Sequence, residues 1–310
     1  MLIDIAFVIG GLALIVFGAD WLVDGASAIA RKAGISEFVI GLTIVGFGTS
    51  CPELVVSLTG SLQGNGAISA GNVLGSNIFN TLLILGLTAV VSPIAVTRSN
   101  RRVDIPMTLA VTLIFIVMAL TGTAVSRLEG IVLLLLFALY MYYCFKTDSG
   151  AEEEGSDKPR SIAMAILLVA AGLVGLIFGG DLFVDHAVSI AHTLGVSDKF
   201  IAITLLAGGT SLPELATCVV AAAKHKQQLA LGNILGSNIF NILLIIGCSA
   251  AVAPVNCEAM SIVDFAALAA SALLVLMCTF TGNKEKLDRW EGFVLIAAFV
   301  AYYVWLFMKL

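Results

Sequence analysis

The sequence predicts an all-α integral membrane protein with ten transmembrane helices in two inverted five-helix repeats. Three observations support this prediction. The 310-residue chain is 59% hydrophobic and only 12% charged, with a mean hydropathy of +1.05, which lies far outside the range of soluble domains. Its apolar runs are long enough to cross a bilayer. Two passages of the chain also recur in closely similar form 161 residues apart.

Ten apolar stretches approach the roughly 20 residues that a helix needs to span the hydrocarbon core. In chain order they cover residues 3–23, 38–62, 72–92, 103–122, 128–145, 162–184, 199–223, 232–253, 261–281 and 290–308. The first stretch has no basic segment before it and no small-residue cleavage site before its end. It therefore predicts a retained helix rather than a signal peptide.

The basic residues sort to one side of the membrane when the chain alternates through these ten stretches. The loops opposite the N-terminus hold 13 of the 16 Lys and Arg residues, and the N-terminal side keeps Arg127, Lys199 and Lys309. The positive-inside rule then places both termini outside the cytoplasm. We expect a multi-pass protein of the plasma (inner) membrane. A miscounted span would scramble this sorting, so the charges also support the count of ten.

The duplication divides the chain into a first repeat at residues 1–145, a cytoplasmic linker at 146–161 and a second repeat at 162–310. Five spans is an odd number, so the second repeat must enter the membrane upside down relative to the first. The acidic stretch AEEEGSD within the linker is typical of a disordered segment.

The repeated passages carry polar motifs. GLTIVGFGTSCPELVVSL begins at Gly41 and AITLLAGGTSLPELATCV at Ala202, with 7 of 18 positions identical. GNVLGSNIFNTLLILG and GNILGSNIFNILLIIG begin at Gly71 and Gly232, with 13 of 16 identical. Matched polar clusters in two membrane-embedded halves are how many ion-coupled transporters build one site.

In the first motif, Thr49 and Ser50 lie four and three residues before Glu53, so all three share one face of a helix. Pro52 lacks an N–H and its ring clashes with the carbonyl of Gly48, which predicts a kink or break. The second copy repeats the pattern with Thr210, Ser211, Pro213 and Glu214. A broken membrane helix needs its freed carbonyls satisfied by protein, water or ions.

A glutamate at the bilayer centre costs about 2.5 kcal/mol or more, so Glu53 and Glu214 predict a function. Carboxylates and hydroxyls form a set of hard oxygens that suits Na⁺ or Ca²⁺. The alternative is that both glutamates are protonated and serve only as structural hydrogen-bonding groups. The presence of both in matched motifs argues against this alternative. The six cysteines and three histidines show no metal-ligand spacing, and neither a resident cofactor nor an enzymatic activity is expected.

The GNxxGSNxxN segments add further candidates. Ser76 and Asn80 are four residues apart and share a helix face, as do Ser237 and Asn241. The glycines of each segment form GxxxG, which permits close helix approach but is a weak signal by itself. Asn72 and Asn233 are candidates either for helix N-caps or for the site.

The first and sixth stretches hold a looser repeat, in which Asp20 aligns with Asp181 and Asp24 with Asp185. These acids fall near the ends of the predicted spans. Solvated interfacial carboxylates are the simpler interpretation, and an ion entry route is the alternative.

GTSxPE followed some twenty residues later by GNxxGSNxxN, present in both halves, closely resembles the α-repeats of the Ca²⁺/cation antiporter superfamily. Within it, the chain resembles prokaryotic sodium/calcium exchangers over essentially its whole length, and those proteins have ten transmembrane helices. The resemblance implies a metal-binding site centred on Glu53 and Glu214. It further implies the ligands Gly46, Thr49, Ser50, Ser76, Asn80, Ala207, Thr210, Ser211, Ser237 and Asn241, with Gly46 and Ala207 acting through backbone carbonyls.

The resemblance also implies Na⁺/Ca²⁺ antiport by alternating access, with the first and sixth helices sliding across the rest. Three Na⁺ exchanged for one Ca²⁺ would make transport electrogenic. Several relatives, including potassium-dependent exchangers, carry Asp at the position of Asn241. The Asn in this chain therefore argues against potassium co-transport. A Ca²⁺/H⁺ antiporter is the main alternative, followed by a passive cation channel and an intramembrane hydrolase. The oligomeric state stays open.

Overall fold

The computed structural model describes residues 1–148, 150, 161–195, 207–281 and 286–309. These residues are almost all helical, and several helices contain π-helical segments, labelled η. The first half comprises α1 (Leu2–Ala33), α2 (Glu37–Ile40), η1 (Gly41–Val45), α3 (Gly46–Thr49), α4 (Cys51–Leu62), α5 (Gly66–Ile78), η2 (Phe79–Ile84), α6 (Leu85–Val91), β1 (Ile94–Ala95), η3 (Asn100–Asp104), α7 (Ile105–Gly122), β2 (Ala124–Val125) and α8 (Arg127–Thr147).

The second half follows a similar element order where it is described, without a counterpart of η3 between β3 and α15. It comprises α9 (Ile162–Thr193), α11 (Ala207–Gly209), α12 (Leu212–Ala223), α13 (Gln227–Ile239), η5 (Phe240–Ile246), α14 (Gly247–Val252), β3 (Val255–Asn256), α15 (Ile262–Cys278), β4 (Lys286–Leu287) and α16 (Arg289–Lys309). Among the described residues, seven continuous helices are long and apolar enough to cross a membrane, and the bent pair Glu37–Thr49 and Cys51–Leu62 makes an eighth. The prediction of an all-α integral membrane protein is confirmed.

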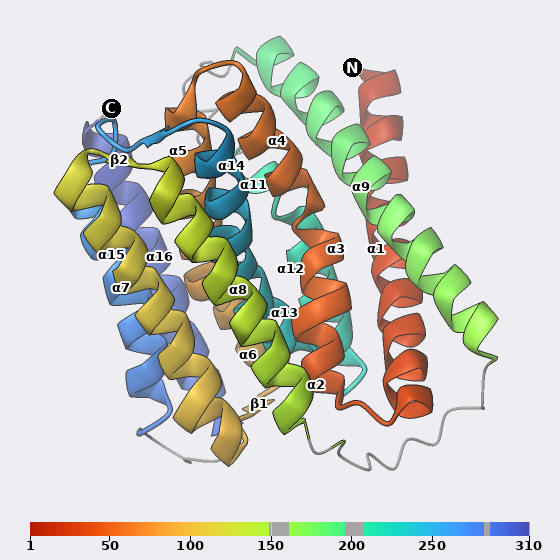
Figure 1. The fold of residues 1–310 in the computed structure, drawn as a ribbon. Coiled ribbons are helices and arrows are strands. Elements are labelled where there is room, and N and C mark those ends of the chain that lie inside the picture. The colour runs from red at the N-terminus through yellow and green to blue at the C-terminus, as the bar shows by residue number, and fades with distance from the viewer. Residues whose placement is uncertain (149, 151–160, 196–206, 282–285, 310) are drawn as a thin grey trace.

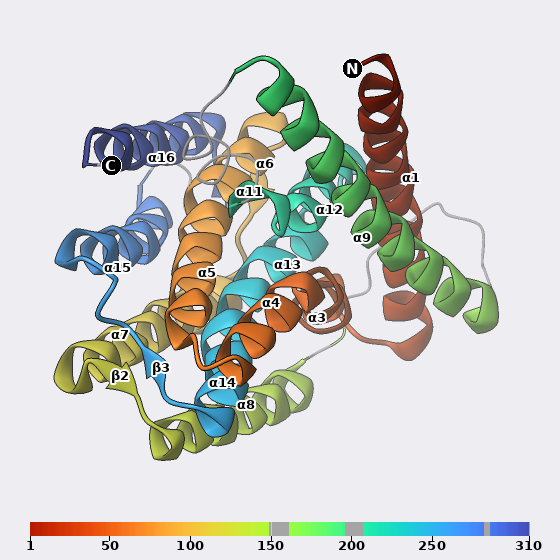
Figure 2. The same cartoon turned by 90° about the horizontal axis from the view of Figure 1, so that it is seen from above.

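The two GNxxGSNxxN segments lie in the centre of the molecule (Figure 2). The span Gly66–Val91 is 72% buried over its most apolar part and Gln227–Val252 is 94% buried, against 22% for α8. Both central helices begin earlier than the predicted residues 72 and 232. The first turns of both helices contain polar residues, Ser69 in α5 and Gln227 and Gln228 in α13, which lower the local hydropathy.

Short antiparallel strand pairs join the two halves at their ends. β1 pairs with β4, with Ile94 opposite Leu287, and β2 pairs with β3, with Val125 opposite Val255. Each pair therefore takes one strand from before the linker and one from after it.

The helices α1 and α9 stand to one side of the other helices and cross each other in opposite directions (Figure 1). Glycines line their crossing. A Cβ atom at Gly18 would lie 2.8 Å from the carbonyl oxygen of Gly172, and one at Gly11 would lie 2.8 Å from that of Gly179. Only glycine permits this backbone approach, so the two long helices pack as one unit.

Candidate functional site

The predicted helix breaks are present in both halves. α3 ends at Thr49, Ser50 leaves helical geometry with ψ of 7°, and α4 begins at Cys51 with Pro52 in its first turn. The helix axis bends by 48° there. In the second half, Ser211 has ψ of 6° directly before α12, which carries Pro213 in its first turn. Proline fits the first turn because its missing N–H has no helical partner there in any case.

The two breaks meet through hydrogen bonds that cross between the halves. The Ser50 hydroxyl donates to Glu214 Oε1 over 3.0 Å, and the Ser211 hydroxyl donates to Glu53 Oε1 over 3.2 Å. All four side chains are at most 3% exposed. Each glutamate is therefore held by the serine of the opposite break, and the two carboxylates belong to one buried cluster.

Each carboxylate keeps one oxygen without a protein partner. Glu53 Oε2 and Glu214 Oε2 are buried and accept no hydrogen bond from the described residues, and the same is true of Asn80 Oδ1 and Asn241 Oδ1. A buried anionic oxygen without a partner is costly. A cation bound at these oxygens would offset that cost.

Further hydroxyls surround the carboxylates. Thr49 and Ser237 lie close enough to Glu214 to interact with its carboxyl group, and Thr210 lies close enough to interact with that of Glu53. The Ser237 hydroxyl also donates to the Gly46 carbonyl over 3.5 Å. The structure thus gathers Gly46, Thr49, Ser50, Glu53, Thr210, Ser211, Glu214 and Ser237 in one region.

The remaining predicted ligands are less directly placed. Ser76 and Asn80 are 2% and 1% exposed, on α5 and η2. Asn241 is fully buried on η5. Ala207 begins α11, directly after residues that lie outside the described ranges.

Two asparagines, for which the sequence left N-cap and site roles open, support the breaks. Asn72 Nδ2 donates to the backbone carbonyl of Glu53 over 3.1 Å, and Thr49 donates to Asn233 Oδ1 over 3.1 Å. The N-cap interpretation of both is wrong, because α5 begins at Gly66 and α13 at Gln227, so both residues lie inside helices. Their identity in both copies of the motif was the available signal.

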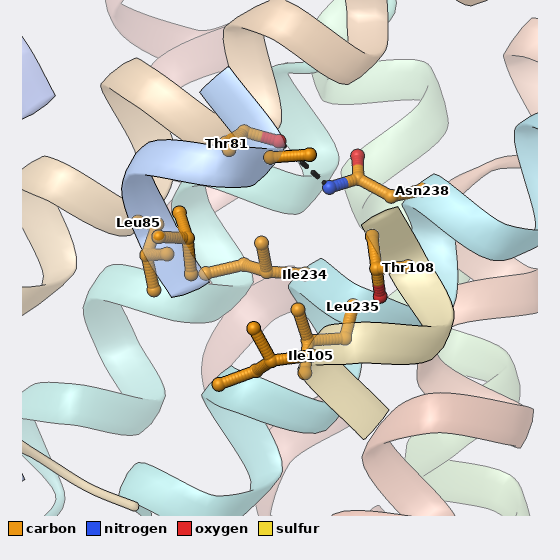
Figure 3. Close-up of a pocket in the computed structure, with 9 residues that line it drawn as sticks. Thr81, Leu85, Ile105, Thr108, Ile234, Leu235 and Asn238 are labelled. Carbon is orange, nitrogen blue, oxygen red and sulfur yellow. Dashed lines mark hydrogen bonds between the residues drawn. The ribbon is translucent and has the colours of Figure 1, made fainter. Parts of the chain in front are cut away.

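The asparagines Asn77 and Asn238 escaped the sequence analysis, and they connect the halves. Asn77 Nδ2 donates to the backbone carbonyl of Asn238 over 3.1 Å, and Asn241 Nδ2 donates to Asn77 Oδ1 over 2.9 Å. The Asn238 amide donates to Thr81 over 2.8 Å beside a small cavity of about 10 Å³ (Figure 3). With its amide nitrogen held by Asn77, Asn241 keeps its oxygen free for another partner.

Replacing Asn77 by Leu is expected to destabilise the protein by about 2–6 kcal/mol. The substitution leaves the Asn241 amide and the Asn238 carbonyl buried without this partner, at about 1–3 kcal/mol for each group. Thermal unfolding in detergent measures the effect. Thr121→Val serves as the control, because Thr121 is exposed and its hydroxyl bonds only to its own helix. Equal midpoints for the two variants would contradict the role of the Asn77 bonds.

The donor chemistry of the cluster favours hard cations. Within the described ranges, no group of three or more His, Cys, Asp or Glu side chains is placed to hold a metal ion. The oxygens available are two carboxylates, several hydroxyls, amide oxygens and a backbone carbonyl. Such mixed oxygen sets suit Na⁺ and Ca²⁺ rather than metals that prefer nitrogen or sulfur ligands.

Comparison with known proteins gives consistent matches. The family model described as "Sodium/calcium exchanger protein" matches residues 3–146 and 164–308. The chain is 33% identical to the sodium/calcium exchanger MaX1 of Methanosarcina acetivorans, over 96% of each protein. It is 36% identical to the inner membrane protein YrbG of Escherichia coli, over 99% of this chain and 97% of that protein. A solved structure of the sodium-calcium exchanger NCX_Mj, soaked with Na⁺ and Ca²⁺, is similar with a TM-score of 0.86 and 34% identity, covering 98% of both chains.

Proposed function

The chain belongs to the sodium/calcium exchanger protein family, and we propose that it exchanges Na⁺ for Ca²⁺ across the membrane by alternating access. The observation that carries the proposal is the reciprocal bonding of Ser50 with Glu214 and of Ser211 with Glu53, which leaves one buried oxygen of each carboxylate free. Transport needs one site that both ions can occupy in turn.

The proposed architecture is ten transmembrane helices in two inverted repeats, residues 1–145 and 162–310, joined by the linker 146–161. Besides the seven long helices and the bent pair, the shorter apolar helices Leu212–Ala223 and Ile262–Cys278 are counted as spans. The opposite directions of α1 and α9 support the inversion, as does a family match in two segments on either side of the linker. With the basic loops in the cytoplasm, both termini lie outside it.

The charge of the site supports competition between the ions. Two ionised glutamates carry −2, which balances one Ca²⁺ or two Na⁺, so the ions exclude each other by charge as well as by space. The twelve predicted residues are the proposed ligands. With three Na⁺ for one Ca²⁺, one net charge crosses per cycle, worth about 2.3 kcal/mol per 100 mV. An inside-negative potential would then assist Ca²⁺ extrusion.

Flux of ⁴⁵Ca²⁺ into proteoliposomes with imposed ion gradients tests the function. We expect an outward Na⁺ gradient to drive uptake, and K⁺ on either side to leave its rate unchanged, because residue 241 is Asn rather than Asp. A pH gradient alone should drive none. Uptake driven by protons without Na⁺ would identify a Ca²⁺/H⁺ antiporter, and uptake without any counter-ion gradient would identify a channel.

A further inference from the structure

An ion-paired cluster joins α1 to the end of α12, away from the glutamates. Lys224 Nζ lies 2.6 Å from Asp20 Oδ1 and 2.5 Å from Asp24 Oδ1. The three side chains are between 28% and 44% exposed. Partial burial by itself would lower the pKa of Lys224, but the hydrogen bonds and charges of both aspartates outweigh it and raise that pKa. The lysine therefore stays charged, and the interpretation of Asp20 and Asp24 as simply solvated is wrong.

The cluster is mechanically connected to the site through one short helix. α12 carries Glu214 in its first turn and is followed directly by Lys224. Ten residues of helix separate the two by about 15 Å. Anything that holds Lys224 against α1 therefore also fixes the position of α1 relative to the helix that bears Glu214.

At the opposite end of the molecule, the described residues show no counterpart of this cluster. The residues 161 positions away from Asp20, Asp24 and Lys224 are Asp181, Asp185 and Gln63. Asp181 and Asp185 are exposed, as solvated interfacial carboxylates would be. α1 packs along α12, and no comparable packing joins α9 to α4 in the part of the chain that the structure describes. Among the described residues, the packing of the α1–α9 pair against the short helix after a break is therefore closer at the end where α1 meets α12.

We propose that Lys224, Asp20 and Asp24 form a latch that keeps the site closed at the end where α1 meets α12. Because α1 and α9 pack through glycines as one unit, both ion pairs must break before that unit can move away from α12. On the proposed topology this end faces the cytoplasm. The inference rests on the proposed function, since a latch has meaning only if access alternates.

Distance measurements between spin labels test the latch without requiring ion flux. With the six native cysteines replaced, labels at the exposed positions Lys32 and Val91 report the separation of α1 from the other helices at this end. Labels at Leu62 and Leu194, also exposed, report the opposite end between α4 and α9. Pulsed electron–electron double resonance gives the populations of short and long label–label distances at each end.

We expect Lys224→Gln to raise the ratio of open to closed molecules at the latch end about three- to ten-fold, the range for losing partly exposed ion pairs. The double variant Asp20→Asn with Asp24→Asn should give the same shift, and Lys224→Arg should keep the distribution of the parent chain. High salt should move the parent chain toward the Lys224→Gln distribution and leave that variant unchanged. In the Lys224→Gln background, Gln63→Lys puts a cation at the position of the first repeat that corresponds to Lys224, and it should raise the population of molecules closed at the opposite end, where Asp181 and Asp185 lie.

The outcomes separate the two proposals. Unchanged distances in Lys224→Gln and in the double aspartate variant, together with intact Na⁺-driven ⁴⁵Ca²⁺ uptake, would overturn the latch alone. Absent uptake by the parent chain under every gradient would overturn the proposed function, whatever the label distances show.

Discussion

Replacing Glu53 by Gln is expected to abolish Na⁺-driven Ca²⁺ uptake, lowering its initial rate by more than about 100-fold, which is the upper range for losing even an outer-shell partner of a metal. Glutamine keeps the shape of the side chain but removes one of the two negative charges that balance Ca²⁺. Glu214→Gln should be equally inactive, because the reciprocal serine bonds give the two carboxylates equivalent places. Proteoliposome flux of ⁴⁵Ca²⁺ measures both.

The loss should be one of binding rather than of folding. A neutral amide is easier to bury than an unbalanced carboxylate, so the thermal midpoint of Glu53→Gln should not fall below that of the parent chain. Glu37→Gln is the matched control. Glu37 is 4% exposed and its Oε1 lies 2.7 Å from Lys226 Nζ, outside the glutamate cluster. Its loss leaves a lysine unpaired, so this variant should be less stable but should still show Na⁺/Ca²⁺ competition. Robust uptake by Glu53→Gln would refute the central role of the carboxylates.

A second large effect is expected when the glycines of the second GxxxG segment are replaced by alanine. A Cβ atom at Gly236 would lie 2.8 Å from Leu42 Cα, and one at Gly232 would lie 2.9 Å from Leu42 N. Backbone atoms cannot move aside as a flexible side chain can, so each substitution should cost about 1–3 kcal/mol. Thermal unfolding in detergent and the yield of monodisperse protein report the change.

The first GxxxG segment supplies the control for this prediction. At Gly75 an added Cβ would meet nothing within 4 Å, and at Gly71 it would meet only the end of Met260, at 3.6 Å. Gly71→Ala and Gly75→Ala should therefore be neutral or stabilising by up to about 1 kcal/mol, from the better helix propensity of alanine. Equal losses in both segments would show that the motif acts through something other than this contact.

Local chemistry made much of the site predictable. Proline kinks or breaks a helix when it lies in the helix interior, so Pro52 and Pro213 are sufficient to predict both breaks. The spacing of Ser50 and Glu53 correctly indicates hydroxyls and a carboxylate at the same break. The partners across the halves were not readable, because Ser50 bonds Glu214 rather than Glu53 and the bond joins residues 164 positions apart.

Other assignments failed where identical motifs lie in different surroundings. Asn72 and Asn233 have the same local sequence and support the breaks through different bonds, the first through the Glu53 carbonyl and the second through Thr49. The aspartates of α1 and α9 align in the sequence. Asp20 is paired with Lys224, whereas the residue 161 positions before Lys224 is Gln63.

By itself, the sequence determined that the chain is a helical membrane protein, where two of its helices break, and that each break supplies a glutamate. These properties follow from hydropathy and from backbone chemistry, which act over a few residues. Only the tertiary structure decided which serine holds which glutamate, which GxxxG segment is closely packed, and that Lys224 joins α12 to α1. The physical reason is that long-range packing sets these contacts, and two nearly identical motifs can have different neighbours once the chain has folded.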